Sequence, residues 1–249
     1  DVYNDLDSNL VNLFRVMQNE DMSAELERRL RSTLYSKEEF VKAIAIVRAE
    51  VEPVDDIEQA WAMFVNMNQS VVGRVFRTQG NWARAAVSLR GESAVIGSWK
   101  SIINRLGFIY DRLSGVLVEH RDALESINYW DGPNTVLYVD PPYVHDTRVE
   151  EDYYAHEMTD PQHTALIEGL LQCEGQVVVS GYDTPIYNEL DEAGWDRVEI
   201  VTVTHMTASQ RSKGESWDRE VKPRGKRTEV VWLNPAAKSK THLTLLDSL

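Results

Sequence analysis

The chain has 249 residues, of which 43% are hydrophobic and 27% are charged. This composition is typical of a folded, soluble protein, and the length suits one large domain or a core domain with a second domain inserted in it. No apolar run reaches about 18 residues, which excludes a membrane-spanning helix, and no signal-peptide pattern is present. The single cysteine, Cys173, excludes an intramolecular disulfide and a cysteine zinc cluster and suits a cytoplasmic protein. The formal net charge of −14 argues against nucleic-acid binding by the whole surface.

The chain up to about Ser114 is predicted to be mostly helical. Apolar residues recur there at helical spacing, after candidate capping residues such as Ser36 and Asp55. The stretch 73–91 has no clean period and predicts a loop or hairpin. Helices are predicted over residues 7–17, 36–47, 55–65 and 99–113.

After Gly115 short apolar runs alternate with helical segments. Helices are predicted to begin at Asp160 and at Thr184, each of which is followed by proline. Trp195 and Trp232 are expected in the core. The alternation predicts an α/β sheet with helices on both faces and a site at the carboxyl ends of its strands. Strands are predicted over residues 116–118, 135–139, 176–180, 197–203 and 228–233.

Two basic islands interrupt the acidic sequence. Residues 69–112 contain seven basic and two acidic residues, and residues 204–228 contain seven basic and three acidic residues. Such islands form either a local phosphate-binding face or two solvated loops, and charge alone does not decide between them.

The tetrapeptide Asp140-Pro141-Pro142-Tyr143 directly follows the strand predicted over 135–139. Its two prolines stiffen the backbone and remove two N–H donors. A carboxylate, rigid carbonyl acceptors and an aromatic face remain, which suit a planar group that carries N–H donors, such as the amino group of a nucleobase. The alternative is a rigid loop with a capping aspartate and a packed tyrosine.

The tetrapeptide resembles the catalytic motif of the Dam-type (D12 class) adenine-N6 DNA methyltransferases. Three further stretches match that family in order, namely Asn4–Asp7, Arg121–Leu124 and Thr228–Asn234. The resemblance implies a Rossmann-like, S-adenosylmethionine-dependent methyltransferase sheet with an inserted, mostly helical target-recognition domain. We therefore expect residues 1–20 to be part of the catalytic domain, residues 21–114 to be the recognition domain, and residues 115–249 to be the rest of the catalytic domain.

The same resemblance implies roles for individual residues. Double-stranded DNA is the expected substrate, a flipped-out adenine the target base, and no metal is required. Tyr143 is implied to stack on the adenine, while Asp140 and the Pro141 carbonyl accept hydrogen bonds from its amino group. The implied S-adenosylmethionine contacts are Asp5, Leu6, Asp122, Ala123 and Asp140. The expected DNA contacts are Arg74, Arg77, Asn81, Arg84, Arg211, Lys213 and Arg224.

One expected motif is absent. Family members carry a glycine-rich loop, F-x-G-x-G, upstream of the motif that contains Asp5, and this chain begins just before that motif. The explanations are an omitted amino-terminal segment, a segment supplied by a second polypeptide, or a non-catalytic relative. We favour the first, because the chain does not begin with Met and its later motifs are intact. We expect the chain as printed to bind the cofactor poorly.

Two rival functions follow. A non-catalytic DNA-binding relative, or one subunit of a split methyltransferase, fits the absent glycine loop. Cytosine-N4 methyltransferases usually have Ser at the position of Asp140, and protein-glutamine and many RNA methyltransferases have Asn, so Asp140 favours DNA adenine and leaves RNA adenine as an alternative. The sequence leaves open the DNA target, the phage or bacterial context, and whether the protein is a monomer or a homodimer.

Overall fold

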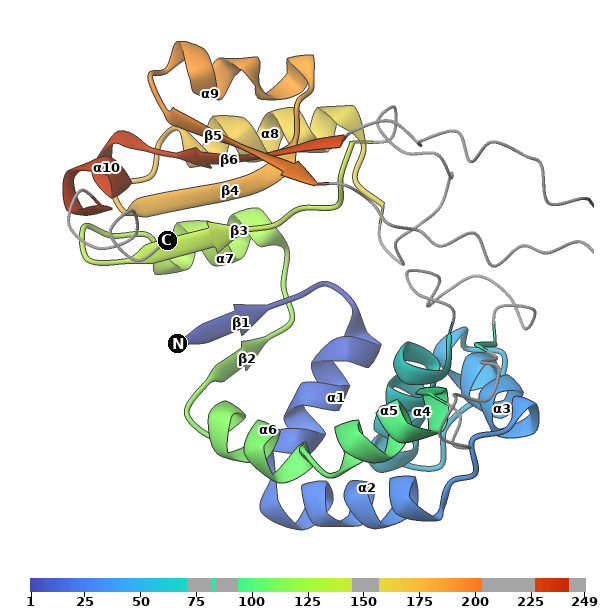
Figure 1. Ribbon diagram of the computed structural model, residues 1–249. Helices are drawn as coiled ribbons and strands as arrows, with labels where there is room; N and C mark the ends of the chain where they lie inside the picture. Colours follow the sequence, from blue (N-terminus) through green and yellow to red (C-terminus); the bar gives the residue numbers. More distant parts are fainter. Residues whose placement is uncertain (71–81, 84–93, 145–156, 203–226, 242–249) are drawn as a thin grey trace, which may run out of the picture. The chain divides into compact units, whose positions relative to one another are not determined.

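The computed structural model describes residues 1–70, 82–83, 94–144, 157–202 and 227–241 (Figure 1). These residues fall into two compact units. The first comprises Asp1–Ser126 with Glu157, and the second comprises the described residues of Ile127–Glu151 and Met158–Leu249. The assignment of residues 1–20, 21–114 and 115–249 to functional domains stays a prediction. The loop or hairpin expected over 73–91 lies outside the described residues except for Trp82 and Ala83.

The first unit is mainly helical (Figure 1). Its early helices begin where polar side chains accept a hydrogen bond from a backbone N–H of the first turn, which otherwise has no helical partner. Asp7, Asn19, Ser36 and Asp55 serve in this way. The helices are α1 (Ser8–Gln18), α2 (Glu20–Ser32), α3 (Lys37–Val47), α4 (Asp56–Gln69), α5 (Ala94–Ile103) and α6 (Leu106–Leu113).

Helix α4 lies at the centre of this unit, because every residue from Ala60 to Asn66 is buried. The ring of Trp99 on α5 meets that of Phe64 edge to face, with 5.8 Å between ring centroids. The helix predicted over 99–113 is divided into α5 and α6. At the junction the Arg105 N–H bonds the carbonyl of Ile102, three residues back, and this tighter turn ends α5.

Two short strands complete the first unit. Strand β1 (Val2–Asn4) pairs in parallel with β2 (Leu117–Glu119), and Tyr3 lies opposite Val118. Strand β2 confirms the strand predicted near 116–118, displaced by one residue. The pairing brings together the ends of two segments that are more than a hundred residues apart in sequence.

The second unit contains a four-stranded sheet in the order β3-β4-β6-β5. Strand β3 is parallel to β4, whereas β6 is antiparallel to both of its neighbours. All four strands lie where the sequence predicts strands. The strands are β3 (Val136–Val139), β4 (Gln176–Tyr182), β5 (Asp196–Thr202) and β6 (Arg227–Leu233). The helices are α7 (Ala123–Trp130), which contains the boundary between the units, α8 (Asp160–Leu170), the 3-10 helix η3 (Pro185–Tyr187), α9 (Asn188–Glu192) and α10 (Pro235–Thr241).

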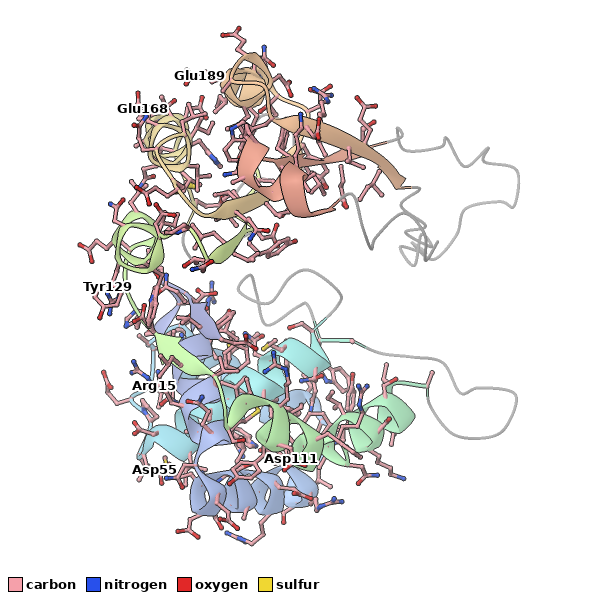
Figure 2. All side chains as sticks on the ribbon, turned by 90° about the vertical axis from the view of Figure 1, so that its left-hand side faces the viewer. Arg15, Asp55, Asp111, Tyr129, Glu168 and Glu189 are labelled. Carbon is pink, nitrogen blue, oxygen red and sulfur yellow. The ribbon has the colours of Figure 1, made fainter. Side chains whose placement is uncertain are left out.

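One face of this sheet is packed. Val177 and Val179 of β4 and Val230 and Trp232 of β6 are fully buried. Helix α8 buries Leu166, Ile167 and Leu170, while its Glu168 lies on the outside of the unit (Figure 2). Trp195 and Trp232 are both buried, as expected.

The opposite face is more open among the described residues, with large side chains of β3 and β5 exposed, namely Val136, Tyr138, Val198 and Ile200. The chain is thus a mixed α/β protein with small sheets. None of the helices in the described ranges is long and apolar enough to cross a membrane.

Candidate functional site

The tetrapeptide Asp140–Tyr143 begins immediately after the carboxyl end of β3. Because β3 and β4 are parallel, the carboxyl ends of both strands lie at the same edge of the sheet. Pro141 is buried, which anchors the loop, whereas Asp140 is exposed. A carboxylate is therefore presented at the strand end on a backbone with restricted freedom.

The orientation of Asp140 is set by β4. The hydroxyl of Ser180 lies 2.7 Å from Asp140 Oδ1, to which it donates a hydrogen bond. The phenol of Tyr138 donates in turn to Ser180 Oγ at 3.3 Å. Side chains from β3 and β4 thus form a short hydrogen-bonded chain that ends on the carboxylate.

The last residue of the tetrapeptide packs on the same strand. The ring of Tyr143 lies with its centroid 4.3 Å from that of Tyr182, at an interplanar angle of 52°. The two rings are thus in close, tilted contact. Asp140 and Tyr143 therefore each contact a residue of β4, and these two residues are two positions apart.

A buried aromatic cluster lies under this edge. The ring of Tyr187 stacks on that of Trp232, with centroids 4.9 Å apart, and its hydroxyl lies 3.2 Å from Nδ1 of the buried His163. Burial, and secondarily the negative charge of Asp140, raise the pKa of Tyr187 far above that of a free tyrosine. His163 is fully buried and packs against the ring of Tyr187 in this cluster.

Gly181 separates Ser180 from Tyr182 and faces this cluster. A Cβ at Gly181 would lie 3.3 Å from Cζ3 of Trp232 and 3.6 Å from Cε2 of Tyr187. The glycine lets the aromatic rings approach the strand closely, so β4 has little room to shift beneath the tetrapeptide.

In the first unit, Asp5 follows the carboxyl end of β1. Its Oδ2 accepts a hydrogen bond from the Tyr3 hydroxyl at 2.8 Å, and its Oδ1 accepts one from the Asp7 N–H at 2.8 Å. Burial and this carboxylate raise the Tyr3 pKa far above its usual value. Leu6, the next residue, is 47% exposed. The carboxylate is held from both sides, beside an accessible apolar side chain.

Asp122 follows the neighbouring strand β2. Asn4 links the two loops, because its side-chain amide donates to the Arg121 carbonyl at 3.0 Å and accepts from the Arg121 N–H at 3.1 Å. Asp122 Oδ1 accepts from the Leu124 N–H at 2.8 Å in the first turn of α7, next to the exposed Ala123. Asp5, Leu6, Asp122 and Ala123 therefore lie on two adjacent loops at the ends of parallel strands.

A family model described as "D12 class N6 adenine-specific DNA methyltransferase" matches residues 2–208, which is well over half of the chain. The chain belongs to this family. No curated protein matches it. The match includes the tetrapeptide and the stretches at Asp5 and Asp122, whereas the closing stretch Thr228–Asn234 lies beyond the matched residues. The family expected from the sequence is confirmed, and the reaction in its description is N6 methylation of adenine in DNA.

The expected DNA contacts of this D12-class chain lie outside the described residues. This holds for Arg74, Arg77, Asn81 and Arg84 of the first island, and for Arg211, Lys213 and Arg224 of the second. Among the described members of the first island, Arg112 pairs with Asp1 at 2.7 Å. Arg105 lines a shallow depression with Ser98 and Ser101 of α5.

Sequence reasoning missed the contribution of β4 to the D12-class tetrapeptide. Ser180 and Tyr182 are absent from the residues chosen by motif, although the strand itself is predicted. The available signal was alternation, since residues two apart on a strand share a face. The described residues contain no group of three or more His, Cys, Asp or Glu side chains arranged to hold a metal ion.

Proposed function

We propose that the protein is a site-specific DNA adenine-N6 methyltransferase that transfers a methyl group from S-adenosylmethionine to a flipped-out adenine in duplex DNA. The observation that carries this proposal is the arrangement of the tetrapeptide in a chain of the D12 class. A hydrogen-bonded carboxylate and a packed aromatic ring both lie at the carboxyl end of β3, on a backbone stiffened by two prolines.

The tetrapeptide holds the target base. Tyr143 stacks on the face of the adenine, which must leave the DNA stack to reach it. Asp140 and the carbonyl of Pro141 accept hydrogen bonds from the N6 amino group, and Pro142 keeps the loop rigid. These bonds localise the nitrogen lone pair, which otherwise delocalises into the ring. The protein's own contribution is mainly position and electrostatics, because it would present a nitrogen with an available lone pair to the methyl group that bound S-adenosylmethionine would supply.

The first unit fits the adenosine part of the cofactor. Each oxygen of the Asp5 carboxylate accepts one hydrogen bond from the described chain, and a carboxylate oxygen has a second acceptor position that a ribose hydroxyl can use. Leu6 and Ala123 supply exposed apolar surface for the adenine ring, and Asp122 supplies a polar contact. When bound, S-adenosylmethionine would supply the methyl group on a positively charged sulfonium.

The remaining assignments belong to the same proposal. The parallel pairing of β3 with β4, with the tetrapeptide at their carboxyl ends, supports a Rossmann-like sheet as the catalytic scaffold. The helices within 21–114 form the inserted target-recognition domain. The arginines, lysine and asparagine of the two basic islands contact phosphates and base edges.

The experiment is methyl transfer from labelled S-adenosylmethionine to unmethylated duplex DNA by the full-length gene product, with the product nucleosides identified. N6-methyladenine is expected. The central variant is Asp140→Asn, which retains size but loses the charge, and it should lower transfer at least a hundredfold, in the range seen when one electrostatic catalytic group is removed.

The matched control is Glu168→Gln, the same chemical change at an exposed carboxylate on α8 of the second unit, which should leave transfer unchanged. Wild-type activity in Asp140→Asn would refute the role of the tetrapeptide. If the wild type binds DNA but transfers nothing, the non-catalytic or split-subunit alternative replaces this proposal.

A further inference from the structure

Strand β4 contributes two side chains to the tetrapeptide that neither the motif nor the family match assigns. We propose that Ser180 and Tyr182 are positioning residues for the methyl-transfer reaction, Ser180 for the carboxylate of Asp140 and Tyr182 for the ring of Tyr143. The inference rests on the proposed function and deepens it. It names the supports that hold the base-binding groups in place.

The two residues share one face of the strand. Along β4, Val177, Val179 and Gly181 are buried, and the residues between them are half-buried. Ser180 and Tyr182 therefore project to the side opposite the packed face, as Tyr138 does on β3 through its pairing with Val178. Alternation along the strand thus places the Ser180 hydroxyl and the Tyr182 ring on one face of β4. There the hydroxyl contacts the carboxylate of the tetrapeptide and the ring contacts its tyrosine.

Ser180 has one proton to donate and two oxygens within reach. Asp140 Oδ1 lies at 2.7 Å and the carbonyl of Val139 at 3.4 Å, so the proton goes to the closer, charged acceptor. The Tyr138 phenol donates to Ser180 Oγ and strengthens this bond. With Oδ1 engaged, the carboxylate cannot rotate freely, and Oδ2 is left to accept from the N6 amino group.

Tyr182 limits the orientation of Tyr143. Its ring contacts that of Tyr143 at a fixed tilt, with centroids 4.3 Å apart. A stacking ring is useful only when its plane is already parallel to the incoming base, because ordering it on binding costs side-chain entropy. The contact with Tyr182 fixes the orientation of the Tyr143 ring before the base binds.

The support is rigid because β4 is an inner strand. It pairs with β3 on one side and with β6 on the other, and Gly181 is enclosed by Trp232 and Tyr187. Groups held on such strands keep their geometry better than groups on loops. Asp140 and Tyr143 belong to a loop, and their contacts with β4 hold their side chains in position.

The test uses the full-length protein and steady-state methyl transfer to unmethylated duplex DNA. Ser180→Ala should lower kcat about tenfold, with the KM for DNA changed less than twofold. Ser180→Thr keeps a hydroxyl on a strand-compatible side chain and should restore most of kcat. Tyr182→Ala should lower kcat/KM for DNA about fivefold, and Tyr182→Phe, which keeps the ring, should restore it. Val198→Ala, on the same sheet face but on β5, is the control and should match the wild type.

The outcomes separate the two proposals. If the wild type makes N6-methyladenine and Ser180→Ala and Tyr182→Ala retain its rate constants, the positioning roles are refuted and the proposed function stands. If Ser180→Thr is as impaired as Ser180→Ala, or Tyr182→Phe as impaired as Tyr182→Ala, the effects are structural and the positioning roles are again refuted. A wild type that transfers no methyl group refutes both proposals.

Discussion

The side chain of Asn234 joins two backbone segments beneath β4, residues 175–177 and the start of α10, and its removal should destabilise the second unit. Its Oδ1 accepts hydrogen bonds from the N–H groups of Val177 and Ala237 at 3.0 and 2.9 Å, and its Nδ2 donates to the Gly175 carbonyl at 2.8 Å. Asn234 is 4% exposed, Ala237 3% and Val177 0%. In Asn234→Ala the Val177 N–H and the Gly175 carbonyl lose this partner where water has little access, whereas the Ala237 N–H keeps its hydrogen bond to the backbone carbonyl of residue 234 at 3.0 Å.

The magnitude follows from that burial. A hydrogen bond contributes about 1 kcal/mol net, and a buried group left unpaired costs about 1–3 kcal/mol. Two buried groups left unpaired predict a loss of about 2 kcal/mol or more for Asn234→Ala. A loss of about 2 kcal/mol raises the unfolded fraction about thirtyfold, and a domain has only about 5–15 kcal/mol of stability in total.

Urea unfolding followed by circular dichroism measures the change in the free energy of unfolding. Hydrogen exchange, followed on a proteolytic peptide that contains residues 176–182, shows where the fold is weakened, since the Val177 amide should exchange far faster in the variant. The control is Asn128→Ala, at an exposed position on α7, which should change stability by less than about 0.5 kcal/mol. A loss below about 1 kcal/mol for Asn234→Ala would mean that water or local rearrangement satisfies the Val177 N–H and the Gly175 carbonyl, which would refute the predicted cost of leaving them unpaired.

Three further predictions concern other parts of the chain. Gly181→Ala should cost about 1–3 kcal/mol of overpacking against Trp232, seen as a lower Tm; an unchanged Tm contradicts the close approach. Asn4→Ala should weaken S-adenosylmethionine binding to the full-length protein about tenfold by calorimetry, because it frees the loop that carries Asp122 from that of Asp5; wild-type affinity would disprove this. Burial raises the pKa of the Cys173 thiol to about 11, so its alkylation rate should rise about tenfold per pH unit up to that pH, and a plateau near pH 9 would contradict it.

The sign of the Cys173 effect on stability follows from the same shift. The fold favours the neutral thiol, whose ordinary pKa is 9.0. The stabilising contribution is therefore complete below about pH 9 and is lost as the pH rises through about 11. Cys173→Ser should remove this part of the alkaline loss in urea titrations at pH 8 and pH 11.

Local patterns were sufficient for most elements. Ser36 and Asp55 cap helices where the sequence predicts them, because an N-cap needs only a polar side chain and the next few residues. The alternating burial of β4 follows from the period of a strand. The division of 99–113 into two helices was missed, because its apolar stripe continues across a turn that is set by backbone bonding at Arg105.

The tetrapeptide was recognisable because its chemistry is contiguous. A carboxylate, two prolines and a tyrosine in a row define acceptors, stiffness and a stacking face without reference to the rest of the chain. Asp5 and Asp122 were implied only by the resemblance of their short motifs to the family, and their roles stay predictions. None of these motifs indicates which side chains from distant parts of the sequence contact the Asp140 carboxylate or the Tyr143 ring.

The sequence by itself determined the family and most of the helices and strands, and it indicated the residues that carry the proposed chemistry, since each depends on neighbours in the chain. Only the tertiary structure decided that β6 lies between β4 and β5, that Asn4 joins the loops of Asp5 and Asp122, and that Ser180 and Tyr182 support Asp140 and Tyr143. The physical reason is that these contacts join residues about 40 or more positions apart, and such pairings depend on strand order and register, which local propensity does not encode.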